Sequence, residues 1–421
     1  MTSLPRIAVL IDLPREKGSG GHVKYWERVA QAAARQDTLP VDLTFYFSGT
    51  GADEILSPHV RYRYLPPIFS TARLKFLPYV PAHTDLARFH PALAEQLPGY
   101  DLIHTTDGFF AFAQTAERIA RWHDIPLTTS FHTDTPAYAE LFTRQTLRHL
   151  LGQTIGNAVA RLFKIPERER AKKEKRLQKH LRQCAAILAM RPEDIAFAKN
   201  AGAAGKIHPM HLGADKDMFS PSRADRVEVE RAYNIASGKF LILFVGRVDA
   251  GKNAPLLLDA CLRARANGVT VHLIVAGTGP VESDIAARLG SDATLAGWVA
   301  PEELARLYAS VDCLAIVSDI EIGGMIGLEA LSCGCPVLVS HKSGVAQACG
   351  APDVMQQIES GVEDWAEAVQ NLANNPARIE TMRTASLSFR QDRLASWDDV
   401  LMQDFLPVWQ NVRQSCSANA S

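Results

Sequence analysis

The chain has 421 residues, of which 47% are hydrophobic and 22% charged, and its formal net charge is -1. This length exceeds one ordinary hydrophobic core and fits two domains of roughly 200 residues each. The balanced charge excludes a bulk binder of polyanions, so nucleic acid is not an expected partner. No apolar run approaches the roughly 18 residues that are needed to span a bilayer.

The seven cysteines are scattered along the chain. Cys333 and Cys335 are two positions apart, but no second pair of thiols or histidines completes a metal site. We therefore interpret the cysteines as small buried residues in a reducing compartment. The first residues enter a strand-like run without a basic segment and a long apolar region, so no signal peptide is expected. The predicted location is the cytoplasm, with peripheral contact at the inner face of the cell membrane left open.

In the first half of the chain, short runs rich in Val, Ile and Leu alternate with longer amphipathic stretches. The runs predicted as strands are 7–13, 42–47, 102–105, 126–131 and 185–190, and the clearest helix is predicted at 23–35. Apolar strands without strict alternation are typical of parallel sheets that are covered on both faces. These elements predict a doubly wound α/β domain.

Residues 161–182 form a strongly basic segment, with ten Lys or Arg and three Glu. Its apolar members are Leu162, Phe163, Ile165, Leu177 and Leu181. One interpretation is a solvated helix that leads into the strand at 185–190. The other is a cationic surface for anionic lipid headgroups, worth about 1 kcal/mol per basic residue near the membrane. The sequence leaves both interpretations open.

The second half repeats the alternation of strands and helices. Strands are predicted at 240–245, 271–276, 313–317 and 336–339, and helices at 254–266, 301–309 and 326–333. The fold class is therefore α/β, with two facing doubly wound, Rossmann-like domains at 1–212 and 213–396. Gly213 and Pro221 punctuate the turn-rich join at 211–221. A helix in 397–421 is predicted to return to the first domain. The ligand site of such a pair is expected at the carboxyl ends of the strands.

The strand at 240–245 runs directly into the segment GRVDAGKN at 246–253. Two cations, Arg247 and Lys252, therefore lie five positions apart where the strand ends, with glycines that allow a tight turn. Arg offers a planar fork for phosphate oxygens and Lys offers a point charge, so the pair suits a diphosphate. The alternative is two ordinary surface cations on a loop.

A second motif follows the strand at 313–317. Glu321 lies at the strand end in a glycine-containing turn, and Glu329 lies eight positions later in the next helix. The N–H groups of Gly324 and Met325 would open that helix and form an anion site. Carboxylates on both sides of the turn are suited to sugar and ribose hydroxyls, with phosphate held by the amides between them.

These motifs, G-R-x4-K-N followed by E-x7-E, resemble those of the retaining glycosyltransferases of the GT-B architecture, in their fourth sequence family (glycosyltransferase group 1). Four further segments match in order: HLGADKDMFSP at 211–221, VAGTGP at 275–280, LAGWV at 295–299 and LYASVD at 307–312. The resemblance covers nearly the whole chain. One departure is Gly323, where the family usually has an aromatic residue, which implies a roomier or more flexible loop around the donor sugar.

The resemblance implies a role for each motif residue. Arg247 and Lys252 would bind the pyrophosphate of a UDP- or GDP-linked sugar, Glu321 its sugar hydroxyls and Glu329 its ribose. The backbone at Val299 would lie against the base. No Asp-x-Asp motif appears where a metal would be needed, so we expect neither a metal nor a cofactor besides the nucleotide sugar. The expected enzyme is a metal-independent hexosyltransferase whose second domain binds the donor.

In the first domain, Gly20 and Gly21 stand where a helix begins, so their amides are candidates to approach phosphate. Taken alone, such a glycine pair is a weak signal, but it matches the paired-glycine loop of the family. His132 follows the strand at 126–131, where the family places a functional histidine near the donor sugar. Asp134 and Tyr138 are candidates to line the acceptor side, and His104 is expected to be a packing or supporting residue.

The segment SFHTDTPAY at 130–138 most resembles the branch that glycosylates lipid headgroups. With the basic residues 161–182, it favours a membrane lipid or a lipid-linked saccharide as acceptor. A polysaccharide or lipopolysaccharide acceptor is the alternative. From other classes, a degenerate GT-B protein that acts as a lipid-binding partner stays open, while no dedicated signal favours an epimerase or a phosphorylase.

Overall fold

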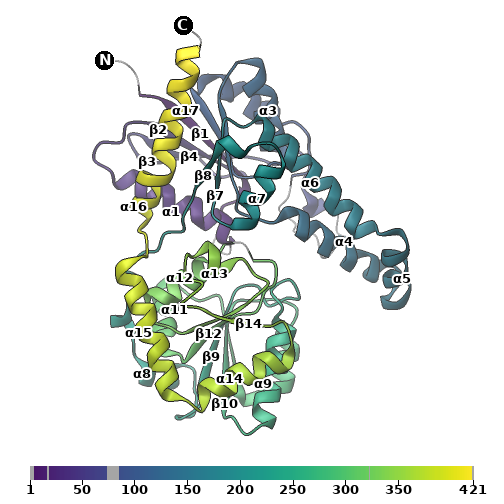
Figure 1. Ribbon diagram of the computed structural model, residues 1–421, viewed down its shortest axis with the longest axis vertical. Helices are drawn as coiled ribbons and strands as arrows, with labels where there is room; N and C mark the ends of the chain where they lie inside the picture. Colours follow the sequence, from purple (N-terminus) through teal and green to yellow (C-terminus); the bar gives the residue numbers. More distant parts are fainter. Residues whose placement is uncertain (1–3, 17–18, 74–84, 322, 420–421) are drawn as a thin grey trace. The chain divides into compact units, whose positions relative to one another are not determined.

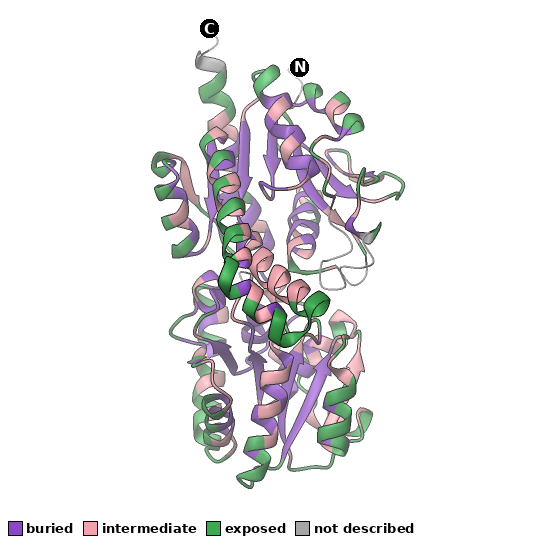
Figure 2. Cartoon of the chain, turned by 90° about the vertical axis from the view of Figure 1, so that its right-hand side faces the viewer, coloured by how far each residue is buried: buried purple, intermediate pink, exposed green. Residues whose placement is uncertain are grey.

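The computed structural model describes residues 4–16, 19–73, 85–321 and 323–419 (Figure 1). Two compact units divide the chain, one formed by Met1–His211 with Trp397–Ser421 and the other by Leu212–Ser396. The division between His211 and Leu212 lies within the predicted join at 211–221, one residue before the boundary between 1–212 and 213–396. Each unit has its own sheet, and the buried residues concentrate in the strands and on the helix faces against them (Figure 2).

The first unit is built on an eight-stranded sheet with the order β3-β4-β2-β1-β5-β6-β7-β8. The five strands predicted there are β1 (Arg6–Pro14), β2 (Asp42–Ser48), β5 (Leu102–Thr105), β6 (Leu127–Ser130) and β7 (Ala186–Ala189). The strands that the sequence analysis missed are β3 (Glu54–Ser57), β4 (Val60–Leu65) and β8 (Ile207–Pro209). All pairings are parallel except that of β3 with β4. The parallel α/β fold is therefore confirmed.

Helices α1 (Gly21–Arg35) and α3 (Ala111–Trp122) bury apolar faces in the first unit. α1 carries Trp26, whose side chain is completely buried. α3 places Phe112 and Ile119 in a cluster with Leu10 of β1 and Ile187 of β7. This core holds the ends of β1, β5 and β6 in fixed positions, and the candidate residues of this unit follow those ends.

Three consecutive helices form an arm that projects from the sheet of the first unit (Figure 1). They are α4 (Thr135–Leu151), α5 (Gln153–Phe163) and α6 (Ile165–Gln183), and residues 135–183 are called the helical arm below. The basic segment 161–182 is therefore not one helix. α5 ends at Phe163, Lys164 adopts a left-handed conformation with φ of 48°, and α6 then leads into β7.

The base of α6 is fixed to the first unit by a buried ion cluster. Glu117 of α3 accepts hydrogen bonds from Arg176 at 2.6 and 3.0 Å and from His180 Nδ1 at 2.7 Å. On the opposite side of its ring, His180 Nε2 lies 3.0 Å from the Thr105 hydroxyl of β5. The arm is thus held firmly where it meets the sheet.

The C-terminal segment packs on the first unit, as predicted. It comprises α16 (Trp397–Asp399), a π-helical segment η6 (Val400–Phe405) and α17 (Leu406–Asn419). The ring of Trp397 lies 5.1 Å from that of Tyr25, and Phe405 lies 5.0 Å from Trp26, both on α1. Asp404 accepts a hydrogen bond from the His211 N–H at 2.7 Å.

The second unit contains a six-stranded parallel sheet with the order β11-β10-β9-β12-β13-β14. Its strands are β9 (Phe240–Val245), β10 (Val271–Ala276), β11 (Ala293–Gly297), β12 (Cys313–Ile316), β13 (Val337–Ser340) and β14 (Gln356–Ile358). The predicted strands are the four central ones, and the missed strands β11 and β14 are the two edges. Edge strands bury less apolar surface, so their sequence signal is weaker.

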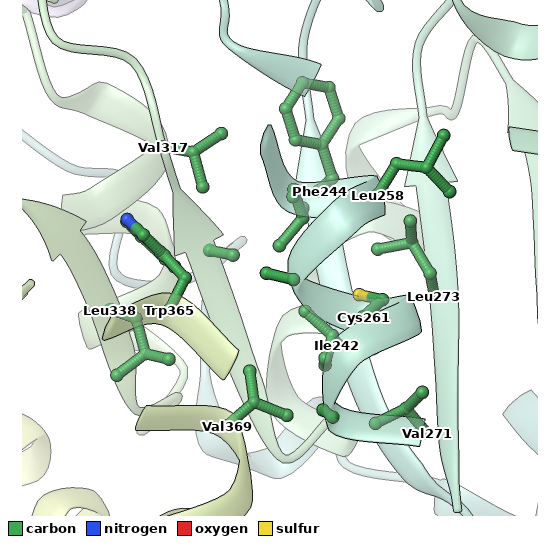
Figure 3. Packing of buried hydrophobic residues seen from close by; sticks show 14 of the residues in the cluster. Ile242, Phe244, Leu258, Cys261, Val271, Leu273, Val317, Leu338, Trp365 and Val369 are labelled. Carbon is green, nitrogen blue, oxygen red and sulfur yellow. The ribbon is translucent and has the colours of Figure 1, made fainter. Parts of the chain in front are cut away.

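Helices α9 (Ala254–Ala266) and α14 (Val362–Ala373) cover one core of this sheet. Leu258 and Cys261 of α9 and Trp365 of α14 pack on Ile242, Leu273 and other strand residues (Figure 3). Helices α11 (Pro301–Ser310), α12 (Met325–Ser332) and α15 (Pro376–Asp392) complete the layers used below. All cysteines of the chain except Cys416 are buried, and the prediction of buried cysteines is wrong for that one.

Candidate active site

The first cationic loop follows β9 in the second unit. Gly246 follows the strand and has a φ of +129°, a conformation that L residues with side chains rarely adopt. Val248 of this loop donates a backbone hydrogen bond to Thr278 O, in the loop after β10, at 2.9 Å. A Cβ atom on Gly277 would overlap with the Gly246 carbonyl. The glycines thus allow two loops to lie against each other at the carboxyl edge of the sheet.

Arg247 and Lys252 lie on this loop with different partners. Arg247 is 56% exposed, and its guanidinium lies 3.2 Å from the Asp249 carboxylate. Asp249 also accepts a hydrogen bond from the Lys252 N–H at 2.9 Å, which closes the turn. The Lys252 ammonium forms an ion pair with Glu321. The two sequence motifs, 69 positions apart at these residues, are therefore in direct contact.

Glu321 lies between β12 and α12, in a segment that is held by hydrogen bonds to residues outside it. Its carbonyl oxygen accepts a hydrogen bond from the Gly344 N–H at 3.2 Å. Two positions earlier, Asp319 accepts hydrogen bonds from the hydroxyls of Ser340 at 2.5 Å and Ser360 at 3.2 Å. Contacts of this kind hold the Glu321 carboxylate next to Lys252.

Helix α12 begins at Met325, and Gly324 precedes it, as the sequence predicts. A Cβ on Gly324 would lie 2.6 Å from Cys349 Sγ and from Val345 Cγ1, so only glycine allows this close packing. A Cβ on Gly323 would meet no atom within 4 Å. The open space beside Gly323 fits the expected roomier loop, and the first-turn amides of α12 have no partner within the helix.

Glu329 lies on α12, where the Tyr308 hydroxyl of α11 donates a hydrogen bond to it at 3.4 Å. Burial, followed by the nearby Glu329 charge, raises the pKa of Tyr308 well above its usual value, so the phenol remains a donor. Val299 follows the edge strand β11, two strands from β9, beside the 59% exposed Trp298. Val299 is therefore the predicted residue farthest along the sheet from the Lys252–Glu321 pair.

In the first unit, the loop after β1 leads to Gly20 and Gly21 at the start of α1. A Cβ on Gly20 would meet no atom within 4 Å, and its φ of −71° is open to any residue. Neither packing nor backbone strain therefore requires glycine there. The first amides of this 15-residue helix have no partner within the helix, which suits an anion.

His132 follows β6 and belongs to a chain of hydrogen bonds that reaches α17. His132 Nε2 lies 2.7 Å from Ser130 Oγ, and Ser130 Oγ lies 2.9 Å from His104 Nε2. His104 Nδ1 accepts a hydrogen bond from the Trp409 indole N–H at 3.3 Å. The ring of His132 also stacks on His22 of α1, with centroids 4.7 Å apart and planes 10° apart.

These histidines are uncharged at neutral pH. Burial lowers the pKa of His22 to about 3. Burial, with a smaller contribution from His180, lowers the pKa of His104 to about 3. Burial, then the neighbouring His22 and His104, lowers the pKa of His132 well below its usual value. A neutral His132 has one donor and one acceptor nitrogen, and does not attract a negative charge as imidazolium would.

Three members of this network were not predicted from the sequence: His22 and Ser130, which contact His132, and Trp409, which donates to His104. His22 directly follows the glycine pair, and Ser130 lies two positions before His132, so both could have been identified from the sequence. Trp409 is 305 positions from His104, and no local pattern signals that contact. Asp12 at the end of β1 was also missed; burial, then Asp107, raises its pKa well above the usual value.

Within the described ranges, no group of three or more His, Cys, Asp or Glu side chains could hold a metal ion. Among the same residues, no helix has the length and apolar character that crossing a bilayer requires.

Two family models match the chain in adjacent segments. The model described as glycosyltransferase family 4 matches residues 19–217, and the model described as glycosyl transferases group 1 matches residues 239–375. With two parallel-sheet α/β units and the paired motifs, these matches define the class of GT-B glycosyltransferases. The chain belongs to family 4 of that class.

The curated relatives are similar over part of their length. The sulfoquinovosyl transferase of Arabidopsis thaliana is 26% identical over 317 residues, which cover 74% of this chain and 52% of that protein. The D-inositol 3-phosphate glycosyltransferase of Rhodococcus erythropolis is 28% identical over 199 residues, or 44% of each chain. The matches thus span about half the length of these relatives.

Solved structures with the same fold cover nearly the whole chain. Anabaena HepE in complex with UDP and glucose has a TM-score of 0.62 at 16% identity, covering 98% of this chain and 100% of that one. WaaG, a glycosyltransferase involved in lipopolysaccharide biosynthesis, has a TM-score of 0.64 at 16% identity, with 94% and 100% covered. At these identities the likeness concerns the fold.

Proposed function

We propose that the protein is a retaining glycosyltransferase that transfers a hexosyl group from a UDP- or GDP-linked sugar to a hydroxyl acceptor. The observation that carries the proposal is the contact between Lys252 and Glu321, with Arg247 on the same loop. It places two cations and a carboxylate where strands of one parallel sheet end, which is the usual ligand edge of such sheets. HepE, which shares the fold, was crystallised with UDP and glucose.

The chemistry follows from competition for Lys252. A bound pyrophosphate would draw the Lys252 ammonium toward its oxygens, and Arg247 would add a bidentate contact. The Glu321 carboxylate would then be free to accept hydrogen bonds from sugar hydroxyls. As the bond between anomeric carbon and phosphate oxygen breaks, negative charge grows on the leaving diphosphate, and both cations stabilise it without a metal.

We further propose front-face displacement for the transfer step. The acceptor oxygen forms its bond to the anomeric carbon on the face from which the diphosphate leaves, and the acceptor proton passes to the leaving phosphate oxygen. No side chain in the motifs is an evident nucleophile, and this route needs none. The configuration at the anomeric carbon would therefore be retained.

For the acceptor, we propose the headgroup of a membrane lipid or a lipid-linked saccharide. Supporting observations are the similarity to the sulfoquinovosyl transferase and the basic residues 161–182, which would contact an anionic membrane surface. A saccharide acceptor of the lipopolysaccharide type is the alternative, since WaaG shares the fold. The intact Lys252–Glu321 pair argues against a non-catalytic lipid-binding protein, which would have no use for it.

The test is to incubate the protein with labelled nucleotide sugars, with and without lipid extract, and to measure free nucleoside diphosphate. Release that depends on lipid supports the proposed acceptor. Release with soluble saccharides alone would replace the lipid by a saccharide acceptor. If no donor of a UDP and GDP panel released diphosphate under any condition, the enzymatic proposal would be wrong.

A further inference from the structure

Large apolar side chains are exposed together at the far end of the helical arm. They are Leu150 and Leu151 at the end of α4, and Ile155, Leu162 and Phe163 on α5, with exposed fractions between 41% and 77%. Soluble surfaces seldom gather so many large apolar residues within a few turns of helix, and such patches usually mark an interaction site. Residues 148–164 are called the arm tip below.

The exposure follows from how α5 packs. Its other face is fixed against α4 through Gly156, because a Cβ there would lie only 2.7 Å from the Arg148 backbone. Ala160, one turn later, is completely buried. Ile155 and Leu162 are seven positions apart and therefore share a face. α5 thus packs on α4 with small residues and leaves the large ones outside.

The charges at the tip are of one sign. Residues 141–166 include no Asp or Glu, whereas Arg148, Arg161 and Lys164 flank the apolar side chains. Arg148 donates to the neutral Asn157 side chain at 2.7 Å rather than to a carboxylate. Farther down the arm the cations are partly neutralised, since Arg170 is paired with both Glu140 and Glu174.

We propose that the arm tip inserts into the interface of an anionic lipid bilayer, with Leu162 and Phe163 in the acyl boundary and the flanking cations at phosphate level. A short helix with an apolar face and basic flanks lies in the plane of the interface, and α5 would cover about 16 Å of it. The contact is thereby located at the arm tip, which shares only residues 161–164 with the basic segment 161–182. For its purpose, delivery of the chain to a lipid acceptor, this inference rests on the proposed function.

Binding is measured with the full chain and no donor, using sedimentation with vesicles of phosphatidylcholine alone or with 30% phosphatidylglycerol, a composition on the order of that in anionic membranes. Leu162→Gln with Phe163→Gln should weaken binding to anionic vesicles at least about tenfold, because two apolar side chains no longer enter the bilayer. Trp122→Gln, which removes an exposed apolar side chain of α3, should leave binding unchanged.

A fluorescent reporter locates the contact independently of affinity. In a Cys416→Ser background, Leu162→Cys labelled with an environment-sensitive dye should shift to the blue on anionic vesicles, and Lys175→Cys on the shaft should not. Equal binding by the tip variant, no binding at low salt, or self-association through the tip without vesicle binding would overturn the inference. Vesicle binding without sugar transfer would instead contradict the proposed function alone.

A second inference concerns the chain of hydrogen bonds that ends at His132. Its direction follows from Trp409, because an indole N–H can only donate. His104 Nδ1 must then carry no proton, and since His104 is neutral, its Nε2–H donates to Ser130 Oγ. The Ser130 hydroxyl is left to donate to His132 Nε2.

The opposite direction would place two protons between Trp409 and His104. It would require His104 Nδ1–H to donate to the Thr128 hydroxyl, 2.9 Å away, while the indole N–H points at the same nitrogen. In the direction assigned above, Thr128 gives up only a 3.5 Å hydrogen bond to Ile103 O. The indole N–H is thus the group that distinguishes the two arrangements, because it needs an acceptor at His104 Nδ1.

We infer that Trp409 is a positioning residue that sets the tautomer of His132, so that the proton is on Nδ1. Nitrogen NMR of the histidine rings reports the protonated nitrogen directly, and His132→Gln identifies the signal. The wild-type chain should show Nε2 of His132 unprotonated, Trp409→Phe should give a mixture or the reverse, and Trp365→Phe in the second unit should change nothing. Ser130→Ala should also mix the tautomers, while Ser130→Thr keeps the link.

A His132 that is protonated at Nε2 in the wild-type chain, or an unchanged tautomer in Trp409→Phe, would overturn this inference. Circular dichroism of each variant separates loss of the fold from loss of the link. The readout does not depend on activity, so it also stands apart from the proposed reaction.

Discussion

Lys252 and Glu321 form the residue pair on which the proposed chemistry depends. Each is about one-fifth exposed, so the pair is reachable from solvent yet not freely hydrated. A lysine in such a pair can exchange its carboxylate for phosphate oxygens at modest cost, because one anionic partner replaces another. The pairing therefore keeps both side chains in place for a donor.

Lys252→Ala should lower turnover at least about a hundredfold, a typical effect of removing one donor to developing negative charge. The matched control is Lys239→Ala. Lys239 is also half-buried and paired with a carboxylate, that of Asp292, but it precedes the amino end of the same strand β9. Steady-state kinetics should show normal turnover for the control, and a comparable loss in both variants would contradict the proposed role.

Glu321→Gln should separate binding from transfer. The substitution releases Lys252 from its partner, so the nucleoside diphosphate, UDP or GDP, should bind up to about tenfold more tightly by calorimetry. Turnover should nevertheless fall, because a neutral amide is a weaker acceptor for sugar hydroxyls than a carboxylate. Weaker binding of the diphosphate by the variant would argue that Glu321 does not compete for Lys252.

At this scale, the sequence placed Lys252 and Glu321 at the ends of two strands of one sheet, because each follows an apolar run; their direct contact was not predicted. The network around His132 could not be predicted in the same way. Its defining member, Trp409, reaches His104 through tertiary packing of the last helix, and a buried tryptophan on a helix looks like any core residue in sequence.

At the scale of elements, the stability of the fold should depend on pH through the buried ion cluster of Glu117, Arg176 and His180. This cluster fixes the base of α6 and is called the anchor below. Burial lowers the pKa of His180, whereas Cys184 and Glu117 raise it. The two partners outweigh burial, so this pKa rises to about 10. Burial alone would raise the pKa of Glu117, but the hydrogen bonds from His180 and Arg176 outweigh it and lower that pKa. Both ions are therefore favoured by the folded chain.

The sign of the pH effect follows from these directions. The Glu117 contribution is present above its ordinary pKa of 4.5 and is lost as pH falls. The His180 contribution is complete below its ordinary pKa of 6.5 and is lost as pH rises toward about 10. The anchor should thus be strongest between pH 4.5 and 6.5. Urea unfolding of the wild type at pH 6 and pH 9 should reveal the loss.

Glu117→Gln should remove most of this pH dependence and destabilise the first unit by about 3 kcal/mol, since it leaves buried cationic partners unpaired. Glu174→Gln is the control, because Glu174 is paired with Arg170 on the exposed shaft of α6 and should cost less than about 1 kcal/mol. A variant at 117 that keeps the full pH dependence would exclude the anchor as its source.

Among the elements, the apolar central strands were predictable, whereas the edge strands and β4, which lies next to the edge strand β3, were not. β4 alternates Arg61 and Arg63 with apolar residues, and β8 includes Pro209, so neither resembles a buried strand. One of the two interpretations of the basic segment was a single solvated helix, although Pro166 signals a helix start after Lys164. The exposed apolar arm tip was not predicted, because Leu162 and Phe163 are two of the few apolar residues in a mostly charged segment.

For the whole molecule, we predict that transfer does not require a divalent ion. EDTA should leave turnover within about twofold of the untreated rate, because Arg247, Lys252 and the amides of α12 would carry the charge that a metal carries elsewhere. The measurement is diphosphate release in buffers stripped of metal. If EDTA inactivated the protein and magnesium or manganese restored its activity, metal-independent stabilisation of the diphosphate would be refuted.

The first unit combines an N-terminal and a C-terminal segment of the chain, so it cannot be completed during synthesis until the second unit has been made. Phe405 and Trp409 fill the space beside Trp26 and His104, which are synthesised more than three hundred residues earlier. The second unit, continuous from Leu212 to Ser396, can fold while the first still lacks these side chains. A chain that stops before Trp397 would therefore contain every residue of the second unit but would lack the buried Phe405 and Trp409 of the first.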